Sequence, residues 1–374
     1  MDSRHTWIWD DADWPSFRWD RAATGEPLAG ARLAQGKVLG AVRLLDPKLS
    51  GEALATILVE EGLTTSAIEG ERLDPDAVRS SVARQLGLPT AGLPVPPRAV
   101  DGLVEILLDA TREQSSPLSK ERLCGWQASL FPAGYSGVHK IRTGELRGTD
   151  PMQVVSAGLE GERVHFVAPP RVVLEDELDQ FLHWFNAPPG ELDGLVRAGL
   201  AHLWFVTLHP FEDGNGRLAR AITDMALAQD ERQPKRFFSL SAQILRVRAS
   251  YYAILEETQR GGLDVSDWLV WFLTQVESAA KAAEQTIADT LAKARFWLRH
   301  QAAVLNARQR KVLNRLLDAG AGGFVGGINT RKYASLTKTS RTTAYRELAD
   351  LVAKGCIEPT GKRGRSSSYE ITWS

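Results

Sequence analysis

The amino-acid sequence predicts a mainly α-helical protein with one β-hairpin in its core and a winged helix-turn-helix at its C-terminal end. Three observations support this fold class. Apolar residues recur with helical spacing over most of residues 51–297. Residues 152–170 combine β-forming residues with glycine and proline instead. Residues 306–374 carry thirteen Lys or Arg against five Asp or Glu, whereas the whole chain has a net charge of −1, and this asymmetry is typical of separate modules.

The composition is typical of a globular protein. With 374 residues, of which 43% are hydrophobic and 24% charged, the chain is long enough for two or three domains. Its two cysteines, Cys124 and Cys356, argue against a disulfide framework or a four-cysteine metal site and favour a reducing compartment. The charged start does not resemble a signal peptide, and no stretch approaches the roughly eighteen apolar residues of a membrane span. We therefore expect a cytoplasmic protein with no membrane partner.

The N-terminal region is expected to be helical and to dock against a later part of the core. Its first twenty residues contain five large aromatic side chains, Trp7, Trp9, Trp14, Phe17 and Trp19. Helical patterning begins near Gly51, a proline-rich loop covers residues 86–99, and helices resume over residues 100–133.

The remainder of the chain supplies the hairpin, the later helices and the basic module. The stretch 152–170 reads as a β-hairpin that ends at two prolines, and helical periodicity returns over 174–185, 192–208 and 243–297. Residues 306–374 have the order helix, helix, helix, strand, which favours a winged helix-turn-helix. We predict four regions: 1–99, 100–275, 276–305 as a connecting helix, and 306–374.

The stretch "HPFEDGNGRLAR" at 209–220 concentrates the polar chemistry of the chain. Gly214, Asn215 and Gly216 precede a helix expected to begin near Arg217, so backbone N–H groups at that helix start can bind an anion. Arg217 and Arg220 are three residues apart and share a helix face, which suits a polyphosphate. The spacing does not match the P-loop or the dinucleotide-binding glycine pattern.

Asp213 and His209 complete this pattern. A carboxylate beside a phosphate site is tolerable when Mg²⁺ lies between the two, so Asp213 is the candidate metal ligand. A neutral His209 can accept a proton from an incoming hydroxyl. Any one of these residues alone is better explained by an ordinary helix–loop–helix connection. Together they predict transfer at a phosphorus centre, catalysed by positioning and electrostatics.

The motif at 209–220 resembles the signature of the Fic family, HxFx(D/E)GN(G/K)RxxR, at every specified position. The predicted hairpin, the pair "YY" at 251–252 and the segment "DWLVWFL" at 267–273 are similar to the family too. The resemblance implies a Fic-type helical core with a β-hairpin flap and transfer of AMP from ATP to a Ser, Thr or Tyr hydroxyl of a protein. It implies that His209 is the base, Asp213 the metal ligand and Gly214 to Gly216 the anion hole.

The resemblance also implies which other residues contact the nucleotide. Arg217 and Arg220 would bind its β- and γ-phosphates, Tyr251 or Tyr252 would line the adenine site, and Gln259 would contact the nucleotide. The flap near Val155 and Ser156 would hold the target segment by strand pairing. The full set of implied ATP-binding residues is Glu69, Val155, Ser156, Gly214, Asn215, Gly216, Arg217, Leu218, Ala219, Arg220, Tyr251, Tyr252 and Gln259.

The stretch "TSAIEG" at 65–70 is similar to the inhibitory motif of the family, (S/T)xxxE(G/N), with Thr65, Glu69 and Gly70 at its specified positions. Thr65 and Glu69 are four apart and share a helix face. The resemblance implies that Glu69 pairs with Arg220 and displaces the γ-phosphate. This short motif alone is also consistent with an ordinary, solvated surface glutamate at position 69.

The basic C-terminal module favours DNA as a partner, with protein contacts or a homodimer as the alternatives. The candidate DNA-binding residues are Arg341, Thr342, Thr343, Tyr345 and Arg346 on the recognition helix and Lys362, Arg363 and Arg365 on the wing. Three rivals to AMP transfer stay open: transfer of another nucleotide or a phosphate, removal of AMP, and a transcription regulator that only senses nucleotide.

Overall fold

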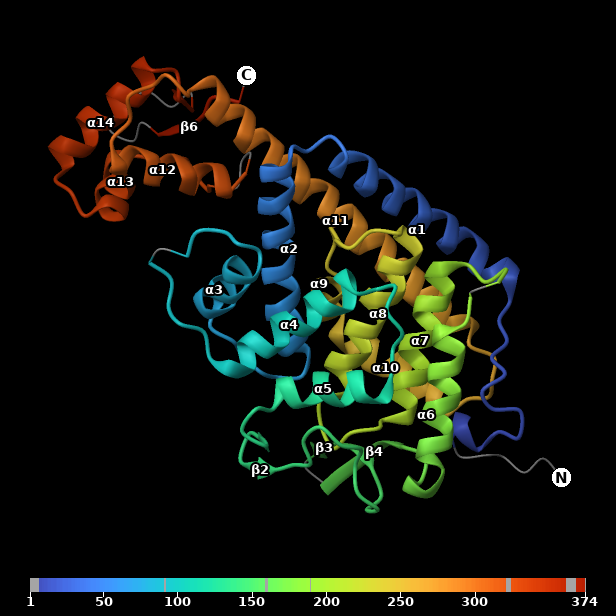
Figure 1. Ribbon diagram of the computed structural model, residues 1–374. Helices are drawn as coiled ribbons and strands as arrows, with labels where there is room; N and C mark the ends of the chain where they lie inside the picture. Colours follow the sequence, from blue (N-terminus) through green and yellow to red (C-terminus); the bar gives the residue numbers. More distant parts are fainter. Residues whose placement is uncertain are drawn as a thin grey trace. The chain divides into compact units, whose positions relative to one another are not determined.

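The computed structural model describes residues 7–90, 92–158, 161–188, 190–320, 324–360 and 368–373. It is mainly helical, with short antiparallel strand pairs, as the sequence predicts (Figure 1). The chain forms two compact units. The first comprises Met1–Leu44 and Ser50–Glu284, and the second comprises Leu45–Leu49 and Gln285–Ser374. The predicted boundaries at residues 99, 275 and 305 stay predictions, since compact units and functional domains need not coincide.

The first unit is a helical bundle with a hairpin. Its helices are η1 (Ile8–Asp10), α1 (Arg21–Val42), α2 (Pro47–Ile68), α3 (Pro75–Gln85), α4 (Arg98–Arg112), α5 (Lys120–Leu130), α6 (Arg171–Asn186), α7 (Gly194–Leu208), α8 (Asn215–Glu231), α9 (Leu240–Arg246), α10 (Arg248–Gln259) and most of α11 (Ser266–Arg299). Its strands pair as β1 (Tyr135–Ser136) with β2 (His139–Lys140) and β3 (Gln153–Gly158) with β4 (Gly161–Val167).

Helix α7 forms the centre of this unit. Every residue from Leu195 to Leu208 is buried, as expected for a helix whose residues are mostly apolar on every face. The helix begins where the Asp193 side chain accepts the Leu195 N–H, and α8 packs along it. Because the motif at 209–220 runs from the end of α7 into the start of α8, this buried helix pair positions it.

The N-terminal aromatic segment docks on the core, as predicted. Trp7 packs edge-on against Phe166 of β4 with ring centroids 5.3 Å apart, and the Trp9 indole N–H donates to the Val167 carbonyl at 2.7 Å. The ring centroids of Trp14 and of the buried Trp204 of α7 are 6.1 Å apart. The segment therefore supports the flap strand β4 and the central helix.

The β3–β4 hairpin occurs where the sequence predicts it. Its strands pair from Gln153 with Val167 onward, with an irregularity between Val154 and Val155. Glu256 of α10 holds the hairpin, because its carboxylate accepts from Arg163 at 2.8 Å and contacts His165 Nδ1 at 2.6 Å. We call this hairpin the flap.

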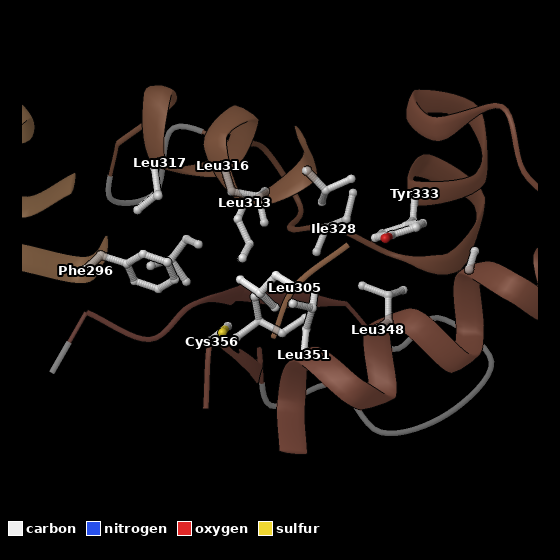
Figure 2. Close-up of a cluster of buried hydrophobic side chains, with 14 residues drawn as sticks. Phe296, Leu305, Leu313, Leu316, Leu317, Ile328, Tyr333, Leu348, Leu351 and Cys356 are labelled. Atoms are coloured by element: carbon white, nitrogen blue, oxygen red, sulfur yellow. The ribbon is translucent and has the colours of Figure 1, made fainter. Parts of the chain in front are cut away.

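The second unit has its own hydrophobic core (Figure 2). Its elements are the end of α11, α12 (Ala307–Asp318), α13 (Thr330–Thr337), α14 (Arg341–Ala353), β5 (Ile357–Pro359) and β6 (Tyr369–Ile371). Leu313, Tyr333 and Leu348 place side chains from three helices into one cluster, and Ile328 bridges Tyr369 of β6. The order of elements is three helices and then strands, and the winged-helix assignment stays a prediction. No helix in the described part of the chain has the length and apolarity to cross a membrane.

Candidate active site around residues 209–220

His209 ends helix α7 in a left-handed conformation, with φ 49° and ψ 56°. Its Nδ1 lies 3.1 Å from the Val206 carbonyl oxygen, which can only accept, so Nδ1 carries the proton in the neutral ring. The lone pair is therefore on Nε2. Burial lowers the pKa of His209, the Arg147 charge lowers it further, and the bond to Val206 together with Glu69 and Asp213 opposes this. A neutral imidazole with a basic Nε2 is the form that a proton acceptor needs.

Arg147 holds the backbone at this histidine and at the residue that follows it, and sequence reasoning missed it. Its Nε donates to the His209 carbonyl at 2.9 Å, its Nη2 donates to the Pro169 carbonyl, and its backbone N–H donates to the Pro210 carbonyl at 3.0 Å. The side chain is 2% exposed. Arg147 lies 62 residues before His209, so nothing in the local pattern of the motif could have indicated the contact.

The loop between the two helices is closed by Asn215. Its amide oxygen accepts the Phe211 N–H at 3.0 Å, and its amide nitrogen donates to the Phe211 carbonyl at 2.7 Å. Both side chains are buried. The Asn215 side chain therefore holds the loop, and its contact with a nucleotide stays a prediction.

Asp213 is held in place by two donors. Its carboxylate accepts the Gly214 N–H at 2.5 Å and the Ser136 hydroxyl, a contact that sequence reasoning missed. The described residues contain no cluster of three or more His, Cys, Asp or Glu suited to a metal ion. A single carboxylate next to a phosphate site nevertheless fits Mg²⁺, which commonly uses one or two protein carboxylates together with substrate phosphates.

The start of α8 has the geometry expected of an anion site. Gly214 has φ +92°, in the region that favours glycine, and a Cβ there would lie 3.0 Å from the Phe131 ring. Helix α8 begins at Asn215, two residues before the expected start, and no side chain caps it. The backbone N–H groups of its first turn therefore face outward with the positive end of the helix dipole.

The Glu69 carboxylate lies at this helix start. Its Oε1 would lie 2.1 Å from a Cβ on Gly216, so the carboxylate lies directly against the backbone of the first turn of α8. Arg220 Nη2 donates to the same oxygen at 2.7 Å. Thr65 accepts from Arg220 twice, from Nε at Oγ1 at 2.7 Å and from Nη2 at its carbonyl at 2.9 Å. The structure thus brings together Thr65, Glu69 and Arg220, as the inhibitory motif predicts.

Arg220 keeps one donor for a ligand. Its side chain is buried, and Nη1 has no partner among the described residues. Burial opposes the charge, but the Glu69 carboxylate offsets this, so the pKa of Arg220 is raised and the guanidinium stays charged. Nη1 would lie 3.3 Å from a Cβ on Gly216, so its unused donor is close to the start of α8. A buried cation with an unused donor at this place is suited to a phosphate oxygen.

A second glutamate, Glu71, which sequence reasoning missed, forms an ion pair with Arg217. Gly70 has φ +85° and ends α2 in a turn where the Glu71 N–H donates to the Ser66 carbonyl. Glu71 Oε2 accepts from Arg217 Nη1 at 3.0 Å. Two glutamates of one turn thus pair with the two arginines of one helix face. The repeated acid in "EGE" at 69–71 was the available signal.

The two tyrosines expected at the adenine site are in different environments. Tyr251 is buried, and its hydroxyl lies 2.8 Å from Nε2 of the buried His202. Burial lowers the pKa of His202 to about 3, so this histidine is neutral and the Tyr251 hydroxyl donates to it. Tyr252 is 39% exposed, and its hydroxyl donates to the Ile68 carbonyl at the end of α2. The structure leaves only Tyr252 of this pair accessible to a ligand.

Three further expected nucleotide contacts are internal. Leu218 and Ala219 are fully buried, and the Leu218 N–H already donates to the Gly214 carbonyl. The Gln259 amide donates to Thr207 Oγ1 at 3.2 Å and is also buried. These side chains pack in the core beneath the site, and their contact with ATP stays a prediction. Val155, 44% exposed, and Ser156 remain accessible on the flap.

The DNA-binding candidates of the second unit lie on α14. Arg341, Thr342, Tyr345 and Arg346 are exposed, while Ala344, Leu348 and Leu351 of the same helix are buried. Thr343 is partly buried, and its N–H donates to the Ser340 cap at 3.1 Å. Lys362, Arg363 and Arg365 lie outside the described residues.

Comparison with known proteins agrees with this site. The model of the Fic/DOC family matches residues 117–227, and the model of a domain of unknown function (DUF4172) matches residues 7–88. The chain is 36% identical over 97 residues to the protein adenylyltransferase fic-1 of Caenorhabditis briggsae, covering 25% of this chain and 17% of that protein. It is 30% identical over 123 residues to the uridine 5'-monophosphate transferase of Xanthomonas campestris pv. campestris, covering 31% and 22%. The chain thus spans less than a quarter of either curated relative.

The fold is shared with a solved structure over nearly the whole chain. A Fic family protein from Desulfovibrio desulfuricans G20 superposes with a TM-score of 0.52 at 18% sequence identity, covering 94% of this chain and 96% of that one. The match to the family model includes both His209 and the arginines of α8. Residues 117–227 of this chain therefore match the Fic/DOC family, and the chain shares its fold with a solved Fic family protein.

Proposed function

We propose that this protein transfers AMP from ATP to a Ser, Thr or Tyr hydroxyl of a protein. One observation supports the proposal most directly. A single short loop places a histidine with a basic Nε2 beside the uncapped start of α8, and the same helix carries Arg220. The loop thus combines a proton acceptor with a polyphosphate site. The activity named for the Caenorhabditis briggsae relative supports the same reaction.

In this reaction, His209 Nε2 takes the proton from the acceptor hydroxyl while the hydroxyl oxygen forms a bond to the α-phosphorus. The bond from that phosphorus to the bridging oxygen breaks, and pyrophosphate leaves. The α8 N–H groups and Arg220 stabilise the phosphate charge, and catalysis comes from positioning and electrostatics. Asp213 would hold a Mg²⁺, which supplies positive charge against the leaving pyrophosphate.

The same geometry supports an autoinhibited state as part of the proposal. Glu69 lies where the negative charge of a phosphate group would otherwise be stabilised by α8 and Arg220. A nucleotide would have to displace this carboxylate or bind with its phosphates shifted. A shift of about 1 Å at the reacting atoms can reduce a rate on the order of a hundredfold.

Labelling with radioactive nucleotide tests the proposed function. The full chain is incubated in a lysate with Mg²⁺ and ATP labelled with ³²P at either the α or the γ position. AMP transfer predicts labelled protein only from the α position, and none with His209→Ala, which should still bind ATP. Labelling from the γ position would instead show phosphate transfer. Because the Xanthomonas relative is named for uridine 5'-monophosphate, α-labelled UTP is compared in parallel.

We further propose that the second unit binds DNA through α14. The exposed face of this helix presents Arg341, Tyr345 and Arg346, while the opposite face fills the core. Basic and aromatic side chains on one exposed helix are suited to phosphate and base contacts. Duplex binding by the full chain, weakened by Arg341→Gln and Arg346→Gln together, tests this; unchanged affinity would instead favour a protein-binding role.

A further inference from the structure

A basic cleft lies in the first unit beside the motif loop. Its volume is about 490 Å³, within the range of small-ligand sites. It is formed by the start of α5, the segment 142–149 and the start of α6, and four basic side chains line it: Lys120, Arg142, Arg147 and Arg171. We call this the α5–α6 cleft.

The acids around the cleft leave one positive charge without a partner. Lys120 and Arg171 share the Glu175 carboxylate, at 2.9 Å and 2.6 Å. Arg142 lies 3.4 Å from Glu145 and 3.5 Å from Glu212. These four cations therefore face three carboxylates, none of which pairs with Arg147.

Arg147 carries the unbalanced charge. It is 2% exposed and donates through Nε and Nη2 to backbone carbonyls, and its Nη1 contacts no hydrogen-bond acceptor within the described ranges. Burial, with the neighbouring Arg171 charge, lowers the pKa of Arg147 to about 10. A buried guanidinium next to a second cation is costly unless an anion compensates it.

We propose that the α5–α6 cleft binds a carboxylate or phosphate group at Arg147, carried either by a free small anion or by an acidic side chain of the protein acceptor. Arg147 then links that anion to the catalytic loop, because it holds the His209 and Pro210 carbonyls. Binding itself does not depend on the transfer reaction. Only its effect on His209 rests on the proposed function.

Cys124 provides a local readout of occupancy. It lines the cleft and is partly exposed, whereas the other cysteine, Cys356, is buried in the second unit. A neutral maleimide should therefore label the folded full chain at Cys124, and an anion in the cleft should shield it. The nucleotide site at α8 contains no cysteine, so an anion bound only there leaves the rate unchanged.

The experiment measures the labelling rate in phosphate, in citrate, and in sodium chloride of equal ionic strength. A Kd on the order of 1 mM predicts that 10 mM anion slows labelling roughly tenfold relative to chloride. A short glutamate-containing peptide, compared with its glutamine counterpart, tests the acceptor-borne source. Shielding by the free anions or by the acidic peptide alone supports the proposal and identifies which source binds.

A matched pair of variants assigns the effect to the cleft. Lys120→Gln should weaken shielding, while Arg79→Gln, which removes an exposed arginine of α3 paired with Asp76, should not. Equal labelling rates in all anions and in the glutamate peptide, with wild type and Lys120→Gln alike, would overturn the proposal. If the wild-type chain transfers no α-³²P label to protein but anions still shield Cys124, the proposed function is overturned and the proposed binding site is retained.

Discussion

Replacing Glu69 with glycine tests the most specific contact of the site. The change removes the carboxylate whose Oε1 accepts from Arg220 Nη2 at 2.7 Å and lies over Gly216. Glu69 directly follows the last residue of α2, so glycine there costs less than it would inside the helix. Arg220 keeps both bonds to Thr65 and therefore stays in place for a phosphate.

The expected magnitude follows from this one contact. A hydrogen bond to a charged group contributes about 1.5–3 kcal/mol, and each 1.4 kcal/mol corresponds to a factor of about ten. Because Arg220 is buried while Glu69 is 33% exposed, the pair is partly screened. We therefore expect Glu69→Gly to label protein roughly 10- to 100-fold faster than wild type, with Glu69→Gln in between since its amide can still accept weakly.

The assay is incorporation of α-³²P from ATP into protein at saturating Mg²⁺-ATP, together with ATP affinity by calorimetry. Glu52→Gln is the matched control, because it removes an exposed carboxylate of the same helix. Arg220→Ala should not mimic Glu69→Gly, since it removes the phosphate contact along with the inhibitory one. Equal rates for wild type and Glu69→Gly would refute autoinhibition, while labelling that still requires His209 would leave the catalytic assignment intact.

Three further predictions concern the other contacts. Because the pKa of His209 is lowered, we expect transfer to be lost only as the pH falls below 6.5, the ordinary pKa of histidine. Arg147→Gln removes a nearby cation, so it should move this loss of transfer to higher pH and reduce kcat. An unshifted pH profile contradicts the positioning role of Arg147. Glu71→Gln frees Arg217 from an ion pair whose glutamate is exposed and therefore screened by solvent, so it should raise the rate less than tenfold, and more strongly when combined with Glu69→Gly. Strictly independent effects would show that the two pairs open separately. The affinity of the full chain for duplex DNA should fall steeply with salt concentration. Neutralising two arginines of α14 should reduce the slope of log affinity against log salt concentration by roughly 2. A salt-independent affinity excludes phosphate contacts.

The sequence by itself determined the parts of this protein that depend on neighbouring residues. Helical periodicity indicated the bundle, and the β-forming run indicated the flap. The spacing within 209–220 predicted that the candidate base His209, a helix start and Arg220 lie within twelve residues. These features could be predicted because each depends on residues a few positions apart. The resemblance to Fic proteins then predicted the long-range contact between Glu69 and Arg220, which the structure contains.

Only the tertiary structure decided which side chains reach the site from elsewhere. Arg147 reaches His209 across 62 positions, and Glu71 reaches Arg217 across 146. The same packing withdrew Tyr251 and Gln259 into the core although their sequence positions suited a nucleotide. Burial and pairing between distant segments depend on how helices pack, and a local pattern of residue types does not specify which face of a helix meets which neighbour.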